Sequence, residues 1–354
     1  MKSQYYLQKR KNIQACIINF IDEENKNDEK LLILKDIFKD QEMYESRDEI
    51  IELFHFLTKL ANNHHQSASF FTKIEQLISL FKNEITKFLS QTEIFQIFMK
   101  NKRILLFLIE QKIFTIDHSM SECMIARGNK KGEYQFYFYK EIKTFIDIEF
   151  NIETDFDIKR KIGQNDSYIS QLIRNDLIDD FIAYTNQTCQ SLSANINSSI
   201  YETNSFLIKN EPTTLIEYSA FFGSIQIFKY LYLNQVKLTS SLWIYAIHGR
   251  NPEIIHFLEE NHIKPKDKTY KECLIEAIKC HHNEIADYFI NNHNLHADDL
   301  LSSIFKYYNY NSFPKNLENE FILYNACHYD YISLVKLLLK NANLNINALI
   351  IKTF

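Results

Sequence analysis

The sequence predicts an all-α fold, a solenoid of stacked helix–turn–helix repeats preceded by a helical N-terminal region. One unit recurs in four irregular copies, at residues 214–238, 241–265, 271–295 and 321–348. Within each copy, apolar residues recur at i, i+3 and i+4, the spacing that places side chains on one face of a helix. Such a repeat decides the architecture, because each unit buries its apolar face only against its neighbours.

The N-terminal region consists of segments with helical periodicity, for example the apolar stripe of Leu53, Phe56, Leu57 and Leu60. The predicted helices span residues 4–24, 29–39, 47–63, 67–89 and 92–114. We assign residues 1–125 to a helical N-terminal domain of unknown function. Residues 101–112 and 175–184 have the apolar phase of a second repeat helix but lack the upstream alanines, so we interpret both as degenerate repeat-like hairpins.

Residues 126–168 are predicted to form an irregular connector. Arg127–Gly132 indicates an exposed loop, and Tyr134–Tyr139 fits either a short strand or the start of a helix. The degenerate repeats are predicted to occupy residues 169–354. A further helix is expected near residues 300–305, where extra length replaces the ordinary link between two repeats.

Each copy carries a small residue seven or eight positions before a pair of residues that opens its second helix. The small residues are Ala220, Ala246, Ala277 and Ala326, and the pairs begin at Ile227, Ile254, Ile285 and Leu334. Small side chains at these positions allow two antiparallel helices to pack closely. We place Gly223, Gly249, Cys280 and Asp330 in the turn between the helices, which makes this turn one residue longer in the second and third copies.

The clearest copies, Ser241–Asn261 and Phe321–Leu339, resemble ankyrin repeats. The pattern is similar to the ankyrin proteins of trichomonad-type protists, whose repeats follow a helical domain of unknown function. The resemblance covers residues 200–354. It implies a fold and a style of partner binding but no activity. The copies depart from the ankyrin pattern because none has the Thr-Pro-Leu-His opening, and successive pairs are 27, 31 and 49 residues apart against about 33 in ankyrin repeats.

Composition excludes several classes of function. The five glycines stand apart, so no phosphate-binding glycine loop can form. A net charge of −5 argues against nucleic acid or an anionic membrane as partner. The basic clusters Lys9–Lys11 and Lys159–Lys161 are interpreted as solvated helix ends.

The chain is expected to be cytoplasmic, with the nucleus as the alternative. No apolar run approaches the length of a membrane span, and the N-terminus lacks the pattern of a signal peptide. The six cysteines show no paired spacing and are read as free, mostly buried thiols of a reducing compartment.

The residue types that bind zinc occur together at Cys273, Cys280, His281, His282, His293 and His296. Their spacing matches no structural zinc pattern, and we place His281 and His282 in a solvated turn, so no metal or cofactor is predicted. No nucleophile with a recognisable base is present, and adjacent carboxylates such as Asp179 and Asp180 diverge by about 100° on a helix. Trp243 is expected to be buried.

The sequence therefore favours a non-enzymatic protein that binds an unknown protein partner as a scaffold or adaptor. The alternative is an unrecognised enzymatic activity in the N-terminal domain, which the repeats would target. By register, the concave surface of the repeats would present Glu217, Phe221, Ile244, His248, Glu276, Lys279, Asn325 and His328.

The last repeat lacks a polar outer face. Its second helix carries Leu334, Val335, Leu337, Leu338 and Leu339, and residues 349–354 read as the approach to another repeat. Terminal repeats need a polar cap for solubility. We therefore expect exposed apolar surface there, through truncation of a longer ancestor or as a docking face for a partner or a second copy, and with it self-association.

Overall fold

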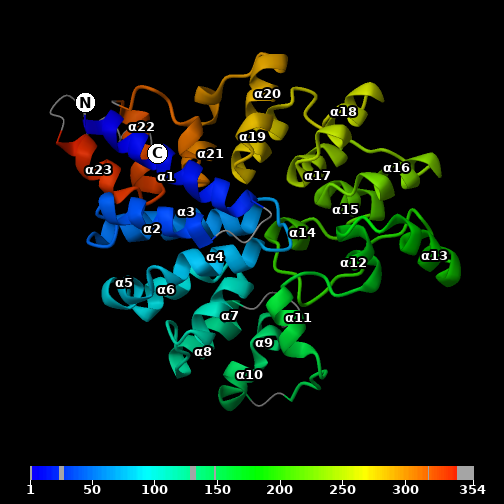
Figure 1. Ribbon diagram of the computed structural model, residues 1–354, viewed down its shortest axis with the longest axis horizontal. Helices are drawn as coiled ribbons and strands as arrows, with labels where there is room; N and C mark the ends of the chain where they lie inside the picture. The colour runs from blue at the N-terminus through cyan, green and yellow to red at the C-terminus, as the bar shows by residue number, and fades with distance from the viewer. Residues whose placement is uncertain (1, 24–27, 128–132, 147–148, 318, 341–354) are drawn as a thin grey trace. The chain divides into compact units, whose positions relative to one another are not determined.

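The computed structural model describes residues 2–23, 28–127, 133–146, 149–317 and 319–340, and helices account for most of them (Figure 1). The described residues form no strand and only one isolated antiparallel bridge, between Asn195 and Thr214. The chain divides into two compact units. Unit 1 combines residues 1–88 with residues 269–354, and unit 2 consists of residues 89–268. These limits differ from the division near residues 125 and 168 that the sequence indicates.

Unit 1 begins with five helices. They are α1 (Lys2–Asp22), α2 (Asp28–Asp40), α3 (Arg47–Asn63), α4 (Phe70–Ser79) and α5 (Lys82–Phe88). The prediction of one helix over residues 67–89 was wrong, because the chain breaks between α4 and α5. Phe81 is fully buried at this break, and its ring lies 4.7 to 5.9 Å from those of Phe38, Tyr44 and Phe54. Aromatic packing thus fixes the turn.

The C-terminal part of unit 1 contains two helix pairs and a short helix between them. The pairs are α19 (Lys271–Cys280) with α20 (Asn283–His293), and α22 (Glu320–His328) with α23 (Ile332–Leu339). Between them lie η2 (Ala297–Leu300), α21 (Leu301–Lys306) and η3 (Tyr310–Ser312), as expected from the apolar residues near position 300. α21 packs against both α19 and α22.

Unit 2 is also built from short helices. It contains α6 (Gln91–Phe98), α7 (Lys102–Glu110), α8 (His118–Arg127), α9 (Glu133–Tyr137), α10 (Tyr139–Ile142), η1 (Lys143–Phe145), α11 (Phe156–Ile162), α12 (Tyr168–Arg174), α13 (Ile178–Thr188), α14 (Ser205–Lys209), α15 (Leu215–Phe222), α16 (Ile225–Leu233), α17 (Leu242–Gly249) and α18 (Pro252–Glu260).

Local structure in unit 2 corrects one expectation from the sequence and settles another that was left open. The single helix predicted over residues 92–114 is two helices, because the Asn101 side chain accepts a hydrogen bond from the Ile104 amide and starts α7. The Tyr134–Tyr139 segment is helical rather than a strand, since it falls in α9 and the start of α10.

Each of the four predicted copies contains one helix pair among the described residues, which exclude residues 341–348 of the last copy. The alanines Ala220, Ala246, Ala277 and Ala326 are all completely buried, as the close approach of paired helices requires. Each inter-helix turn contains one residue with left-handed backbone, and in every copy it lies four positions before the pair of residues that opens the second helix. These residues are Gly223, Arg250, His281 and Asp330.

This regular turn corrects the placement of Gly249 and Cys280. Both end their helices rather than lie in the turn, so the second and third copies have the same two-residue turn as the first, and only the fourth has three residues, 329–331, between its helices. Gly249 is needed for another reason, since an added Cβ would lie 2.0 Å from the Ala220 carbonyl oxygen. At Gly223, where φ is +71°, a Cβ would lie 2.7 Å from the Gly249 carbonyl oxygen. Backbone contact between neighbouring helix pairs therefore selects both glycines.

A further helix pair, α12 with α13, packs against α15 and α16. It contains the degenerate hairpin predicted near residues 175–184. Its turn also has one left-handed residue, Asp176, whose carboxylate accepts hydrogen bonds from the Gln226 and Ile227 amides at the start of α16. A carboxylate at a helix N-terminus is stabilising, because it satisfies amides that lack a partner within the helix.

Candidate binding surface

The eight residues predicted to face a partner occupy different environments. Phe221, His248 and Asn325 are buried, and Glu217, Ile244, Glu276 and Lys279 are half-buried. His328, on α22, is exposed.

Each buried member of this set has a contact within its own unit. The His248 ring lies 4.2 Å from that of Phe206 and 4.9 Å from that of Phe221. The Asn325 side chain donates to the Phe321 carbonyl at 2.8 Å, within α22. Lys279 pairs with Glu276 at 2.7 Å. The side chain of this set that a partner can reach most freely is therefore that of His328.

His328 belongs to an exposed aromatic face on α22. Phe321 is 56% exposed, and Tyr324 is 41% exposed. The Tyr324 and His328 rings are stacked with centroids 5.9 Å apart. Positions 321, 324 and 328 follow the i, i+3, i+7 spacing, so the three rings share one side of the helix.

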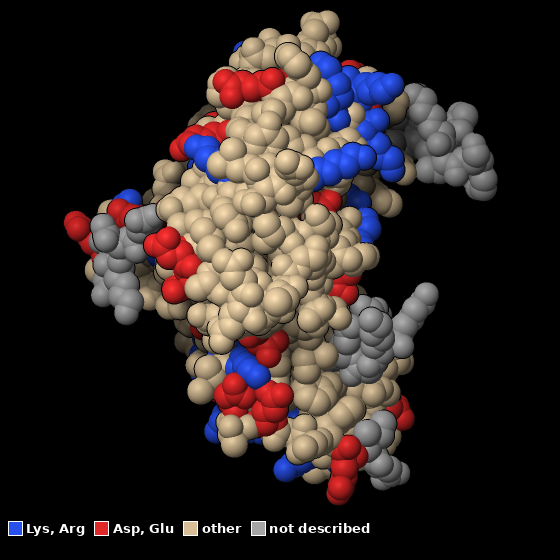
Figure 2. Space-filling model, turned by 90° about the vertical axis from the view of Figure 1, so that its right-hand side faces the viewer, with Lys and Arg blue, Asp and Glu red and all other residues tan. Residues whose placement is uncertain are grey.

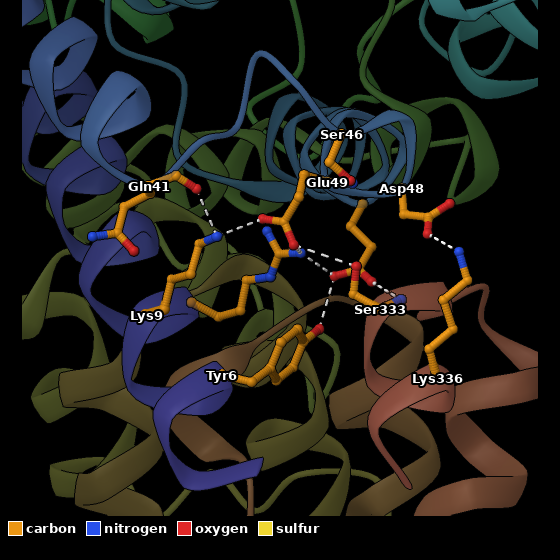
Figure 3. Close-up of polar contacts among 10 residues, drawn as sticks. Tyr6, Lys9, Gln41, Ser46, Asp48, Glu49, Ser333 and Lys336 are labelled. Atoms are coloured by element: carbon orange, nitrogen blue, oxygen red, sulfur yellow. Dashed lines mark hydrogen bonds and ion pairs between the residues drawn. The ribbon is translucent and has the colours of Figure 1, made fainter. Parts of the chain in front are cut away.

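The basic cluster at residues 9–11 is not a solvated helix end. Arg10 is buried on α1 and pairs with Glu52 at 2.6 Å and Glu49 at 3.0 Å, both on α3. Lys9 pairs with Glu49 at 2.9 Å and donates to the Gln41 carbonyl (Figure 3). Tyr6 donates to Glu52 at 2.7 Å. The sequence pattern does not reveal this, because the partner carboxylates lie about 40 residues away.

The second basic cluster, at residues 159–161, is paired in the same way within unit 2. Arg160 is buried and bonds Glu141 at 2.7 Å and Asp157 at 2.8 Å. Lys161 pairs with Glu110 at 3.0 Å. Both basic clusters therefore connect helices and leave no open cationic field.

The carboxylates of α3 also hold the N-terminus of α23. Glu52 accepts a hydrogen bond from the Ser333 amide at 2.9 Å, and Glu49 accepts one from the Ser333 hydroxyl at 3.3 Å. Lys336 pairs with Asp48 on the same side of α3 (Figure 3). Burial raises the pKa of Glu52, and Arg10 and Tyr6 act in the opposite direction. A carboxylate buried this deeply depends on its donors.

This packing corrects the expectation that the second helix of the last repeat is uncovered. α23 packs against α1 and α3, and Leu334 and Leu338 are completely buried. Val335 and Leu337 are half-buried, and Leu339 is 50% exposed. The N-terminal helices thus cover much of the surface that a further repeat would have covered. Residues 349–354, which were read as the approach to another repeat, lie outside the described residues, as do residues 341–348 of the last copy.

α1 and α23 flank an open groove of about 730 Å³. Its lining residues are Lys2, Tyr5, Tyr6, Lys9, Glu49, Ser333, Lys336, Leu337 and Lys340. Tyr5 is 69% exposed, whereas Tyr6 is buried and forms part of the floor. The sequence carried a signal for this groove in the lysines at positions 2 and 9 and at 336 and 340, but nothing in the sequence places the two helices side by side.

The residues considered as zinc ligands lie in varied surroundings. His281 and His282 are buried rather than solvated, because α3 packs on α19 and brings Phe56 to 5.3 Å from His281 and His64 to 5.0 Å from His282. His293 stacks on Tyr270 at 3.7 Å. Burial lowers the pKa of His281 to about 3, and the nearby His64 adds to this shift. His281 is therefore neutral at physiological pH.

The burial of Trp243 agrees with the prediction from the sequence, whereas the burial of the cysteines does not. Trp243 is completely buried, as predicted, and its indole donates to the Ile263 carbonyl at 2.8 Å. The cysteines are free, but Cys123, Cys189 and Cys327 are exposed, so the expectation of mostly buried thiols was wrong.

On the face shown in Figure 2, neutral side chains cover most of the surface, and Lys and Arg side chains gather mainly in one group at the upper right. No described helix combines the length and the apolar composition that a membrane crossing requires.

Comparison with known proteins finds a match for only part of the chain. Residues 233–316, which include α17 to η3, match the family described as a domain of unknown function (DUF3447). No curated protein and no solved structure matches the chain. The family description assigns no activity.

Proposed function

We propose that this chain is a non-enzymatic scaffold or adaptor, built from degenerate ankyrin-type repeats, that binds a protein partner through exposed side chains of its helix pairs. The observation that carries the proposal is the aromatic face of α22, formed by Phe321, Tyr324 and His328. Aromatic side chains contribute strongly to protein interfaces, because they bury a large area at a small cost in conformational entropy.

The alternative of an enzymatic N-terminal region receives less support. Titratable side chains converge within residues 1–88 at Tyr6, Arg10, Glu49 and Glu52, and a separate pair joins His64 and Asp22 at 2.7 Å. The first four bond one another, and the carboxylates of Glu49 and Glu52 also bond Ser333. Because these side chains are already engaged in bonds that join helices, they favour a structural role. Self-association through the last helix pair is also less favoured, since Leu334 and Leu338 are already buried.

Quantitative affinity capture tests the proposed function. The full chain is immobilised and compared with Phe321→Ser/Tyr324→Ser and with a control, Leu233→Ser, whose side chain is 76% exposed on α16. We expect a defined set of proteins to be retained by the wild type and the control and lost with the double variant. Retention of the same proteins by all three chains would exclude the α22 face. Retention of none would count against a binding function.

A further inference from the structure

The groove between α1 and α23 points to a second recognition site. We propose that it binds an acidic segment of a partner protein that carries a large apolar side chain. The inference goes beyond the proposed function, because it concerns other helices than α22 and specifies the chemistry of the bound segment.

The two walls of the groove present lysines at helical spacing. Lys2 and Lys9 are seven residues apart on α1, and Lys336 and Lys340 are four residues apart at the end of α23. At 1.5 Å per residue, these spacings correspond to about 10 Å and about 6 Å along the helix axes. Carboxylates one or two turns apart on a bound helical segment match such spacings.

The positive charges of the groove are only partly neutralised by the chain itself. Lys9 pairs with Glu49, and Lys336 pairs with Asp48. Lys2 and Lys340 are exposed, and neither has an ion-pair partner among the residues that the structure describes. Four lysines and two carboxylates leave the groove with two positive charges, opposite in sign to the net charge of the chain, −5. An anionic ligand is therefore electrostatically complementary to the groove.

The lining between the lysines is apolar. The Tyr5 and Tyr6 rings and the Leu337 side chain supply this surface, and Tyr5 is 69% exposed without a ligand. A volume of about 730 Å³ lies in the usual range for ligand sites and exceeds what a phosphate ion fills. An apolar side chain on the bound segment would cover Tyr5 and Leu337 while its carboxylates meet the lysines.

The same features disfavour two other polyanions. Electrostatic lipid recognition typically uses four to eight cationic side chains next to a membrane, whereas two of these four lysines are already paired. Nucleic acid binding depends on neutralising several phosphates, which a site with two net charges on an acidic chain does poorly.

Peptide selection tests the proposal with the full chain. Random 16-residue peptides displayed on phage are selected on the immobilised protein, and fluorescein-labelled copies of enriched peptides are titrated by anisotropy. The test variant is Lys2→Gln/Lys340→Gln. The matched control is Lys35→Gln/Lys39→Gln, which removes two exposed lysines from α2 of the same unit.

We expect the enriched peptides to contain several Asp or Glu residues and a large apolar residue. Their affinity should fall about 2- to 30-fold in the test variant, as expected for two exposed ion pairs, and stay unchanged in the control. The difference should shrink at 0.5 M NaCl, since salt screens exposed charges. Binding by Phe321→Ser/Tyr324→Ser should equal that of the wild type, which separates this site from the α22 face.

Three outcomes would overturn the proposal. The first is enrichment of peptides without acidic residues, and the second is equal affinity for the test variant and the wild type. The third is the absence of any peptide binding while vesicles with 30% phosphatidylserine bind in a manner that depends on Lys2 and Lys340, which would identify the groove as a lipid site.

Discussion

At the scale of single residues, small size and burial determine which residues occupy positions at and beside the turns between paired helices more than polarity does. Gly249 has no positive φ in the structure, and its role is to let its backbone approach Ala220. The left-handed position is filled instead by Arg250, and in the next copy by His281. Non-glycine residues tolerate this conformation at some cost, so the surrounding packing must hold them there.

His281 gives a prediction about pH. Its pKa is lowered from 6.5 to about 3, so between these values the unfolded chain binds a proton at this position that the folded chain does not. Stability therefore falls as the pH drops below 6.5, by up to about 1.4 kcal/mol per pH unit from this residue. Replacing His281 should reduce the loss of folding stability between pH 7.5 and pH 5.0 by about 2 kcal/mol.

Urea denaturation of the full chain and of His281→Gln at these two pH values checks this expectation. His256→Gln is the control, because the His256 side chain is 70% exposed on α18. Identical pH dependence of His281→Gln and wild type would show that His281 is not held neutral by burial.

At the scale of elements, hydrogen bonds and ion pairs join the N-terminal helices to the last helix pair. Glu52 on α3 accepts from Tyr6, Arg10 and the Ser333 amide, so a single carboxylate joins α1, α3 and α23. Gln14 adds a second connection, because its side chain bonds both the Tyr308 carbonyl and the Asn311 amide. α1 thus contacts segments nearly 300 residues away in the sequence.

The buried ion pair of Arg10 and Glu52 predicts that removing one of the two charges destabilises the chain more than removing both. Glu52→Ala leaves Arg10 buried without its closest partner and should destabilise the chain by about 3–5 kcal/mol. Arg10→Met/Glu52→Leu removes both charges and should recover most of that loss. Guanidinium denaturation of the three chains provides the measurement. A double variant as unstable as the single one would mean that the loss does not come from the unpaired charge of Arg10.

At the scale of the molecule, unit 1 is discontinuous in sequence. Residues 1–88 and 269–354 form one compact unit, and the 180 residues between them form the other. The apolar stripe of α1, which includes Ile13 and Ile17, is buried in this unit, and α1 packs against η3 and α23. An N-terminal fragment would expose that surface to water.

This organisation predicts how fragments behave. Residues 1–88 and 269–354, expressed together as separate chains, should purify as a complex with cooperative thermal unfolding. Residues 1–125 alone should show no cooperative transition, because α1 and α3 would lack the helices that cover them. Differential scanning calorimetry distinguishes these cases. A cooperative transition for residues 1–125 alone would establish an independent N-terminal domain.

The sequence by itself determined the helical class and indicated the segments that form the four helix pairs, although it placed Gly249 and Cys280 in turns rather than at the ends of α17 and α19. Apolar periodicity and the buried alanines are local properties, and a helix pair forms between segments only a few residues apart. The sequence also indicated His328 as a surface residue. It failed at the breaks near residues 80 and 100, where Phe81 packing and the Asn101 cap override a continuous apolar pattern.

Only the tertiary structure decided what the charged and terminal segments do. Arg10 and Glu52 are 42 residues apart, and Glu52 and Ser333 are 281 apart, so no local pattern distinguishes these side chains from solvated ones. The same holds for the groove, whose lysines lie near opposite ends of the described chain. Burial, pairing and cavities depend on which helices meet, and that information is carried by long-range packing rather than by spacing along the sequence.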